Sequence, residues 1–481
     1  MLLRRFYDDT LAQASYLIGC QRTGDAIVVD PNRDAEQYLA AARSEGVRIS
    51  HVTETHIHAD FVSGARELAR RADAQLLLSD CGAPAWRYAF ASEGATLLRD
   101  CDTISVGNVR LEVMHTPGHT PEHIAFVVTD TAGADQPMGI LSGDFVFVGD
   151  VGRPDLLERA AHVAGSTDAL ARKLFQSLRR ARCLPDWLQL WPGHGAGSAC
   201  GKALGAVPQS TLGYERRFNW AFQIDDEETF VREVLAGQSD PPPYFARMKR
   251  LNQRGPRILG GFPEPVEIDE IGLREAMRVG APIIDTRPTA AFAEGHLRGA
   301  LSIPAGKSFL TWAGWLVDGE RELHLIADDA RAAKAAMRAL AMIGVDRVIS
   351  FATPASMRAA AGAGALQKVE RLSASELRTR IEQGGVHVVD VRNASEWQAG
   401  HLPGVPNIPL GRLASHIGEL PRDRIIVAQC QSGMRSMIAS SIFQARGVPR
   451  VMDLRGGFEA WTAAGLPVER ADRLANASAP A

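Results

Sequence analysis

Short apolar runs and helix-like stretches alternate from Ala26 to about residue 219. Residues 26–30, 110–114 and 124–128 are short runs of the kind typical of strands, so each is expected to form a strand. Residues 35–44 form one of the helix-like stretches. Histidines and acidic residues follow the apolar runs at their ends. This placement is expected of a fold in which packed sheets form a rigid core and the loops at the strand ends carry the ligands.

An internal repeat occupies the last third of the chain. The segments Asp-x-Arg, Gly-His-Leu and Ile-Pro begin at Asp285, Gly295 and Ile303, and recur at an offset of 105 residues at Asp390, Gly400 and Ile408. The later Gly-Val pair at 344–345 recurs at 447–448, an offset of 103, so a short insertion or deletion separates the registers. Each copy alternates apolar strands with helical patterns. The repeat predicts two tandem α/β domains with parallel sheets.

Proline and glycine mark the boundaries between these parts. Residues 238–265 include a Ser-Asp-Pro-Pro-Pro-Tyr segment and a Gly-Gly-Phe-Pro segment, and are expected to be a linker. The expected domains are therefore residues 1–237, 266–366 and 367–472, and residues 473–481 are expected to be a disordered tail.

Composition excludes several classes of function. The 481 residues include 53 basic and 56 acidic side chains, a net charge of -3, so we expect neither nucleic acid nor a membrane as a partner. Acids at positions 8 and 9 stand where a signal peptide would have its apolar run, and six cysteines are too sparse for a disulfide scaffold. We therefore expect a cytoplasmic protein that acts on small molecules, and a homo-oligomer.

Metal-type ligands are scattered over four loops of the first domain. They are His56, His58, Asp60, His119, Asp144 and His194. These loops resemble those of the metallo-β-lactamase fold, which implies an αββα sandwich. Two-metal hydrolases of that fold read His-x-His-x-Asp-His, but the last position here is Phe61. Because a phenyl ring offers no lone pair to a cation, the pattern favours one metal ion.

Within that fold, the chain resembles the persulfide dioxygenases, a mononuclear iron branch. The resemblance implies that His56, His119 and Asp144 hold one Fe(II) per chain and leave open positions for substrate and O₂. It further implies that His58, Asp60 and His194 orient ligands and solvent; the alternative is that these three hold a second metal.

Two further residues of this domain are candidates for the site. Arg153, in the segment 149–155 that also resembles this family, is expected to bind an anionic substrate or to be a structural anchor. Cys200 follows His194 by six residues, on a loop expected to pass near the metal. Its thiol either exchanges sulfur with the metal pocket or is a small packed side chain.

The second repeat contains a candidate nucleophile. The strand-like residues 424–429 lead into Cys430-Gln431-Ser432-Gly433-Met434-Arg435, and a helical stretch follows. Backbone N–H groups of such a loop form an anion cradle, and Arg435 is expected to add positive field, so we expect Cys430 to be a thiolate of lowered pKa. The loop resembles that of rhodanese sulfurtransferases. The resemblance implies that Cys430 carries a sulfane sulfur and that residues 431–434 contact the substrate.

The first repeat lacks this nucleophile. Mapping Cys430 back by either offset lands between Leu325 and Ala327, and no cysteine occurs between positions 201 and 429. We therefore expect residues 266–366 to be a degenerate rhodanese domain with a structural or docking role.

These resemblances imply a persulfide dioxygenase fused to an inactive and an active rhodanese. The expected substrates are low-molecular-weight persulfides, O₂, sulfite and thiosulfate, and the implied purpose is sulfide detoxification. Two alternatives stay open: a zinc thioester hydrolase of the glyoxalase II type, and a sulfur-relay protein in which only Cys430 reacts. The sequence decides neither the thiol carrier nor the net direction of sulfur flow.

Overall fold

The computed structural model divides into two compact units, residues 1–263 with 339–344 and residues 264–338 with 345–481. It describes all residues except 157, 159–164, 239–240, 363–365 and 471–481, so the tail expected at 473–481 lies outside the described residues. Among the described residues, no helix combines the length and apolar character needed to span a bilayer.

The first unit contains two six-stranded mixed sheets. The first sheet has the order β1 (Leu2–Asp8), β2 (Gln13–Cys20), β3 (Asp25–Val29), β4 (Arg48–Thr53), β5 (Gln75–Ser79) and β6 (Thr96–Leu98). The second has the order β12 (Ser210–Thr211), β11 (Gln189–Pro192), β10 (Gly139–Gly143), β9 (Ile124–Asp130), β8 (Val109–His115) and β7 (Thr103–Val106). The three strands expected from the sequence are thus β3, β8 and β9.

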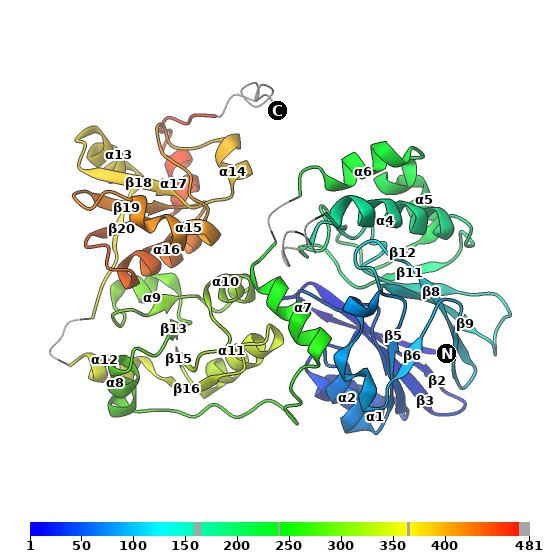
Figure 1. The fold of residues 1–481 in the computed structure, drawn as a ribbon. Coiled ribbons are helices and arrows are strands. Elements are labelled where there is room, and N and C mark those ends of the chain that lie inside the picture. The colour runs from blue at the N-terminus through cyan, green and yellow to red at the C-terminus, as the bar shows by residue number, and fades with distance from the viewer. Residues whose placement is uncertain (157, 159–164, 239–240, 363–365, 471–481) are drawn as a thin grey trace. The chain divides into compact units, whose positions relative to one another are not determined.

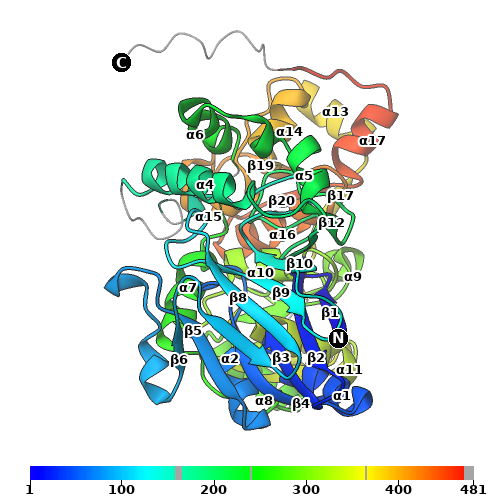
Figure 2. The same ribbon diagram turned by 90° about the vertical axis from the view of Figure 1, so that its right-hand side faces the viewer.

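Helices cover the outer faces of both sheets (Figures 1 and 2). The helices of this unit are α1 (Ala35–Glu45), α2 (Ala65–Ala72), η1 (Pro84–Trp86), η2 (Ala89–Glu93), α4 (Thr167–Ala181), α5 (Leu212–Phe218), η3 (Trp220–Gln223), α6 (Glu227–Leu235) and α7 (Tyr244–Arg254). Side chains of β3 alternate: Ile27 packs between the sheets and Val28 packs under α1 and α2. Both faces are therefore buried, which confirms the αββα sandwich.

The structure differs from the sequence prediction at the expected linker, 238–265. Helix α7 lies inside that range, and its buried residues Tyr244, Phe245, Met248 and Asn252 follow a helical spacing. The prolines that suggested a linker stand just before this helix, where Pro243 is its N-cap. Helix α7 packs into the first unit, so most of the expected linker belongs to that unit. The boundary with the second unit falls at Pro263, near the end of the expected linker.

The second unit contains two four-stranded parallel sheets, one for each repeat. The first has the order β14 (Leu301–Ser302), β13 (Ile283–Asp285), β15 (Leu323–Ile326) and β16 (Val348–Ala352). The second has the order β17 (Glu370–Leu372), β20 (Val451–Leu454), β19 (Ile425–Gln429) and β18 (Val386–Asp390). An isolated parallel bridge adds one more segment to each sheet, from Glu267 to Phe351 in the first and from Asp390 to Asn407 in the second. With these bridges, the two sheets have the same order of segments. The repeat seen in the sequence is therefore a repeat of one fold.

Helices pack on both faces of the sheet of the second repeat. The first repeat has α8 (Glu270–Arg278), α9 (Thr289–Glu294), α10 (Phe309–Leu316), α11 (Ala330–Met342) and α12 (Pro354–Ala361). The second has α13 (Ala374–Glu382), α14 (Ala394–Ala399), η4 (Leu410–Arg412), α15 (Leu413–His416), η5 (Ile417–Glu419), α16 (Met434–Ala445) and α17 (Gly457–Ala463).

The two repeats contact each other through α16. Ser302 N donates to Ser441 Oγ at 3.1 Å, and His296 Nε2 lies 2.9 Å from Gln444 Oε1. Met437 of α16 is fully buried in the core of the first repeat. The helix that follows the Cys430 loop is thus packed against the cysteine-free repeat.

Candidate metal centre and sulfur-carrying loop

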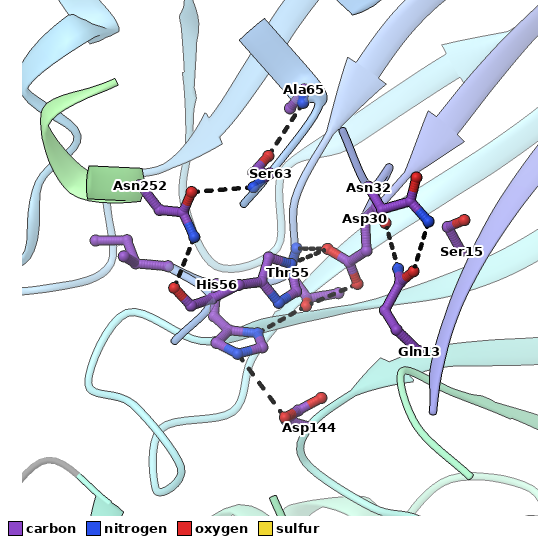
Figure 3. Close-up of polar contacts among 12 residues, drawn as sticks. Gln13, Ser15, Asp30, Asn32, Thr55, His56, Ser63, Ala65, Asp144 and Asn252 are labelled. Carbon is purple, nitrogen blue, oxygen red and sulfur yellow. Dashed lines mark hydrogen bonds and ion pairs between the residues drawn. The ribbon is translucent and has the colours of Figure 1, made fainter. Parts of the chain in front are cut away.

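His56 lies on the loop that follows β4, and Asp30 holds this loop in place (Figure 3). Asp30, at φ 53°, accepts hydrogen bonds from Thr55 N at 2.6 Å and Thr55 Oγ1 at 2.9 Å. Thr55 Oγ1 in turn lies 3.0 Å from His56 Nδ1. Because Nδ1 is engaged, the ring presents Nε2 towards Asp144, whose Oδ2 lies 3.9 Å away.

His119 and Asp144 complete a group of three donors. His119 Nδ1 donates to the carbonyl oxygen of Arg153 at 3.0 Å, and its Nε2 lies 3.5 Å from Asp144 Oδ2. The donor atoms of His56, His119 and Asp144 all lie within 4.8 Å of one another, and all three residues are buried. The structure thus brings together the three residues that the sequence analysis selected.

The chemistry of these donors fits a divalent metal. Burial lowers the pKa values of His56 and His119, which keeps both imidazoles neutral. Burial opposes ionisation of Asp144, but the neighbouring His194 and His119 outweigh it and lower its pKa. Neither carboxylate oxygen of Asp144 accepts a hydrogen bond from an N–H or O–H group, although both are buried. Such orphaned oxygens are costly unless a cation binds them.

His58 packs against His56, with 4.2 Å between ring centroids, but is not one of the three donors. Its Nε2 lies 3.0 Å from Asp30 Oδ1, and its ring packs on Phe61 with 4.4 Å between centroids. Burial would lower the pKa of His58, but Asp30 outweighs burial and raises it to about 9. A ring held in this way supports the loop that carries His56.

Asp60, His194 and Cys200 form a second group of donors, also within 4.8 Å of one another. His194 Nε2 lies 3.2 Å from Asp60 Oδ2 and 3.5 Å from Asp144 Oδ2, so the two groups are adjacent. The Cys200 thiol is buried, and burial together with Asp60 and Asp144 raises its pKa well above the usual range. The loop bearing Cys200 therefore passes beside the candidate metal centre, as expected.

Arg153 is fully buried and connects two parts of the site. Its guanidinium binds Asp155 through Nε at 3.0 Å and Nη2 at 2.8 Å. Its backbone N–H donates to Cys200 O at 3.1 Å, and its carbonyl accepts from His119. Of the two roles expected for Arg153, this arrangement favours the structural anchor.

Sequence reasoning missed several polar residues around the centre. Asn252 of α7 donates to the carbonyls of His58 at 2.8 Å and Phe61 at 2.7 Å, and no local pattern indicates this. Glu122 accepts from Ile57 N at 3.0 Å, and burial raises its pKa to about 7. Its position three residues after His119 was the only signal available.

The Cys430 loop joins β19 to α16. Gly433, at φ 105°, donates its N–H to Cys430 Sγ at 3.2 Å, and Sγ lies 3.4 Å from Ser436 Oγ. Gln431 accepts from Arg392 through Oε1 at 3.2 Å. Ser432 belongs to the loop and Met434 begins α16, so the expected substrate contacts of residues 431–434 stay predictions.

Arg435 has a partner that the sequence analysis did not name. Its Nη1 and Nη2 each lie 2.7 Å from a carboxylate oxygen of Glu396 in α14. The charge of Arg435 is therefore already compensated, because a bidentate carboxylate fills its donor fork. That Arg435 adds positive field around Cys430 stays a prediction.

The first repeat has the same loop position without the nucleophile. Thr286 N donates to Ile326 O, as Val391 N donates to Gln429 O, so Ala327 stands where Cys430 stands. The Asp-x-Arg pair is kept: Arg287 binds Asp285 and Gly295 O, as Arg392 binds Asp390 and Gly400 O. The first repeat thus retains the scaffold of the second repeat and lacks its cysteine.

Comparisons with known proteins match two regions of the chain. A family model described as the metallo-beta-lactamase superfamily matches residues 8–194, and one described as a rhodanese-like domain matches residues 373–464. The crystal structure of a metallo-beta-lactamase from Staphylococcus aureus subsp. aureus COL is 42% identical, with a TM-score of 0.66; the match covers 74% of this chain and 99% of that chain.

Two curated relatives of the first unit have different activities in their names. The hydroxyacylglutathione hydrolase of Nitrosococcus oceani is 28% identical over 268 residues, which cover 50% of this chain and 94% of that protein. The mitochondrial persulfide dioxygenase ETHE1 of Bos taurus is 29% identical over 162 residues, 34% of this chain and 59% of that protein. Similarity alone therefore does not decide which reaction takes place at the candidate metal centre.

Proposed function

Because this chain belongs to the metallo-beta-lactamase superfamily and carries a rhodanese-like domain, we propose that it is a persulfide dioxygenase joined to a sulfurtransferase. The observation that carries the first activity is the donor group His56, His119 and Asp144, with Phe61 in place of a further ligand. Two imidazoles and one carboxylate leave positions free for substrate, an arrangement that non-heme Fe(II) oxygenases use.

The proposed oxidation is balanced as R-S-SH + O₂ + H₂O giving R-SH, sulfite and two protons. A ferrous ion held by the three donors would supply O₂ activation. The surrounding residues fix the donors: Thr55 and the Arg153 carbonyl engage the Nδ1 atoms of His56 and His119, so that both Nε2 atoms face Asp144. His194 and Asp60 border the same space and would orient solvent or substrate.

The proposed transfer uses Cys430. A sulfane sulfur attached to Cys430 Sγ is attacked by the sulfur of sulfite. The S–S bond to Sγ breaks, its electron pair returns to Cys430 as a thiolate, and the new S–S bond makes thiosulfate. The Gly433 N–H, 3.2 Å from Sγ, would stabilise the returning charge. Fusion of both activities in one chain would keep sulfite close to the persulfide that consumes it.

A specific observation favours a second candidate, a zinc thioester hydrolase. Asp60, His194 and Cys200 form another donor group beside the first, and a second metal there would create a two-metal site. In that case Cys200 would replace the ligand lost at Phe61.

One experiment separates the two candidates. Full-length protein is prepared anaerobically, its metal content is measured, and O₂ uptake is followed with glutathione persulfide as the probe. We expect one iron per chain and one O₂ consumed per persulfide. Two zinc ions per chain, with hydrolysis of a glutathione thioester in the absence of O₂, would establish the hydrolase instead.

A further inference from the structure

Glu396 ties the sulfur-carrying loop to the neighbouring helix α14. Its Oε1 and Oε2 bind the two terminal nitrogens of Arg435, and Oε2 also accepts from Asn393 N at 3.1 Å. The side chains are 31% and 16% exposed, so the pair is shielded from solvent on most sides. The donor fork of Arg435 is therefore filled by a carboxylate that belongs to the protein itself.

The first repeat shows that the fold does not need this pair. By the same offsets that relate the two repeats, Ala291 stands at the position of Glu396 and Ala332 at that of Arg435. Both partners are lost together with the cysteine, whereas the buried Arg287–Asp285 pair of the scaffold is retained. The Glu396–Arg435 pair thus occurs only in the repeat that has the cysteine, and the fold forms without it.

Glu396 borders open space. It lines a cavity of about 420 Å³ together with Arg392, Gln431, Phe458 and Arg470, among others. Gln431 is the residue next to Cys430, and Arg435 is the second residue of α16. Glu396 lines the cavity and Arg435 does not, so an anion in the cavity meets the carboxylate before the guanidinium that the carboxylate binds.

We propose that Glu396 is a positioning residue that competes with oxyanion substrates for Arg435. The three oxygens of sulfite, and the three on the central sulfur of thiosulfate, match a guanidinium fork as a carboxylate does. Without Glu396 the cation would hold the thiosulfate dianion tightly and slow its release. This inference rests on the proposed sulfur transfer at Cys430, and it adds how that site controls its affinity for dianions.

Glu396→Gln in the full-length protein tests the idea. Glutamine fills the same space and is accepted at the third position of a helix with an N-terminal capping box, so α14 should keep its start. The amide removes the negative charge from Arg435. We expect the KM for thiosulfate as sulfur donor, and its inhibition constant as product, to fall about fivefold or more. Sulfur transfer from glutathione persulfide to a thiol, in which no sulfur oxyanion takes part, should change by less than about twofold.

Glu376→Gln is the matched control. Glu376 occupies the same third position of α13, where it accepts from Ser373 N at 2.8 Å, and it does not bind Arg435. This variant should leave both constants for thiosulfate unchanged. Calorimetric binding of thiosulfate to Cys430→Ser, with and without Glu396→Gln, gives the affinity independently of turnover.

The outcomes distinguish this inference from the function on which it rests. An unchanged or raised KM and dissociation constant in Glu396→Gln overturns the inference alone, since Glu396 would then be neutral or would pre-order Arg435 for the substrate. Wild-type protein that transfers no sulfur from thiosulfate, or Cys430→Ser that still does, overturns the proposed transfer and this inference together.

Discussion

The side-chain amide of Asn252 donates a hydrogen bond of 2.7 Å to the carbonyl oxygen of Phe61. It also donates to His58 O, and its Oδ1 accepts from Ser63 N. One side chain of α7 thus satisfies three backbone groups on the loop that carries His56. Helix α7, which lies inside the expected linker, therefore supports the loop that carries His56.

Asn252→Ala should destabilise the first unit by about 1–3 kcal/mol, because it leaves buried carbonyls without donors. We also expect weaker iron binding, since the loop that presents His56 is loosened. Chemical denaturation and iron titration of the full-length protein measure both effects. Asn252→Asp, which keeps the acceptor and removes both donors, should resemble the alanine variant. Wild-type stability in both variants would mean that solvent replaces these bonds without cost.

Replacing His56, His119 or Asp144 by alanine should reduce O₂ uptake with glutathione persulfide to background. The group contains three donor residues, so the loss of one leaves only two, which are too few to hold the metal ion. Sulfur transfer at Cys430 should persist in each variant, because Cys430 belongs to the second unit. Parallel loss of both activities would point instead to unfolding or to one shared site.

Cys430→Ser should change the product rather than the rate of oxidation. Wild-type protein supplied with persulfide and O₂ is expected to release mainly thiosulfate, and the variant mainly sulfite, because only Cys430 passes sulfane sulfur to sulfite. Chromatographic quantification of the two anions under equal O₂ supply measures the ratio. Identical ratios would mean two independent enzymes on one chain.

Cys200→Ser should slow oxidation on the order of tenfold, or shift the product ratio, with iron content unchanged. The thiol lies beside Asp60 and His194, outside the group formed by His56, His119 and Asp144. Cys183→Ser, at an exposed cysteine, is the control and should behave as wild type. Loss of metal from Cys200→Ser alone would favour the two-metal hydrolase.

The Glu396–Arg435 pair should stabilise the second unit in a pH-dependent way. The side-chain hydrogen bonds from Arg435 lower the pKa of Glu396, so the folded state holds the carboxylate ionised more strongly than the unfolded state does. This contribution is present above the unfolded carboxyl pKa of about 4.3 and is lost as pH falls through the lower folded value. The difference in Tm between wild type and Glu396→Gln should therefore shrink below about pH 4. A difference independent of pH would show that packing, rather than charge, distinguishes the variants.

The sequence predicted those parts of the fold and site that depend on local pattern. Strand periodicity located β3, β8 and β9, and the resemblance of the metal loops to a known family implied His56, His119 and Asp144. The partner of Arg435 could not be predicted, because Glu396 lies 39 residues away and only the parallel sheet brings them together. The contacts of Asn252 could not be predicted either, because Asn252 is 191 positions away from Phe61.

The placement of α16 has a consequence for where this protein can be cut. Ser441 and Gln444 reach the first repeat from the helix that begins beside Cys430, and Met437 is buried there. A fragment starting near residue 367 would expose that methionine and strip two polar contacts from the helix. We therefore expect that any fragment able to carry out the proposed sulfur transfer contains both repeats, because the first repeat covers Met437 of α16.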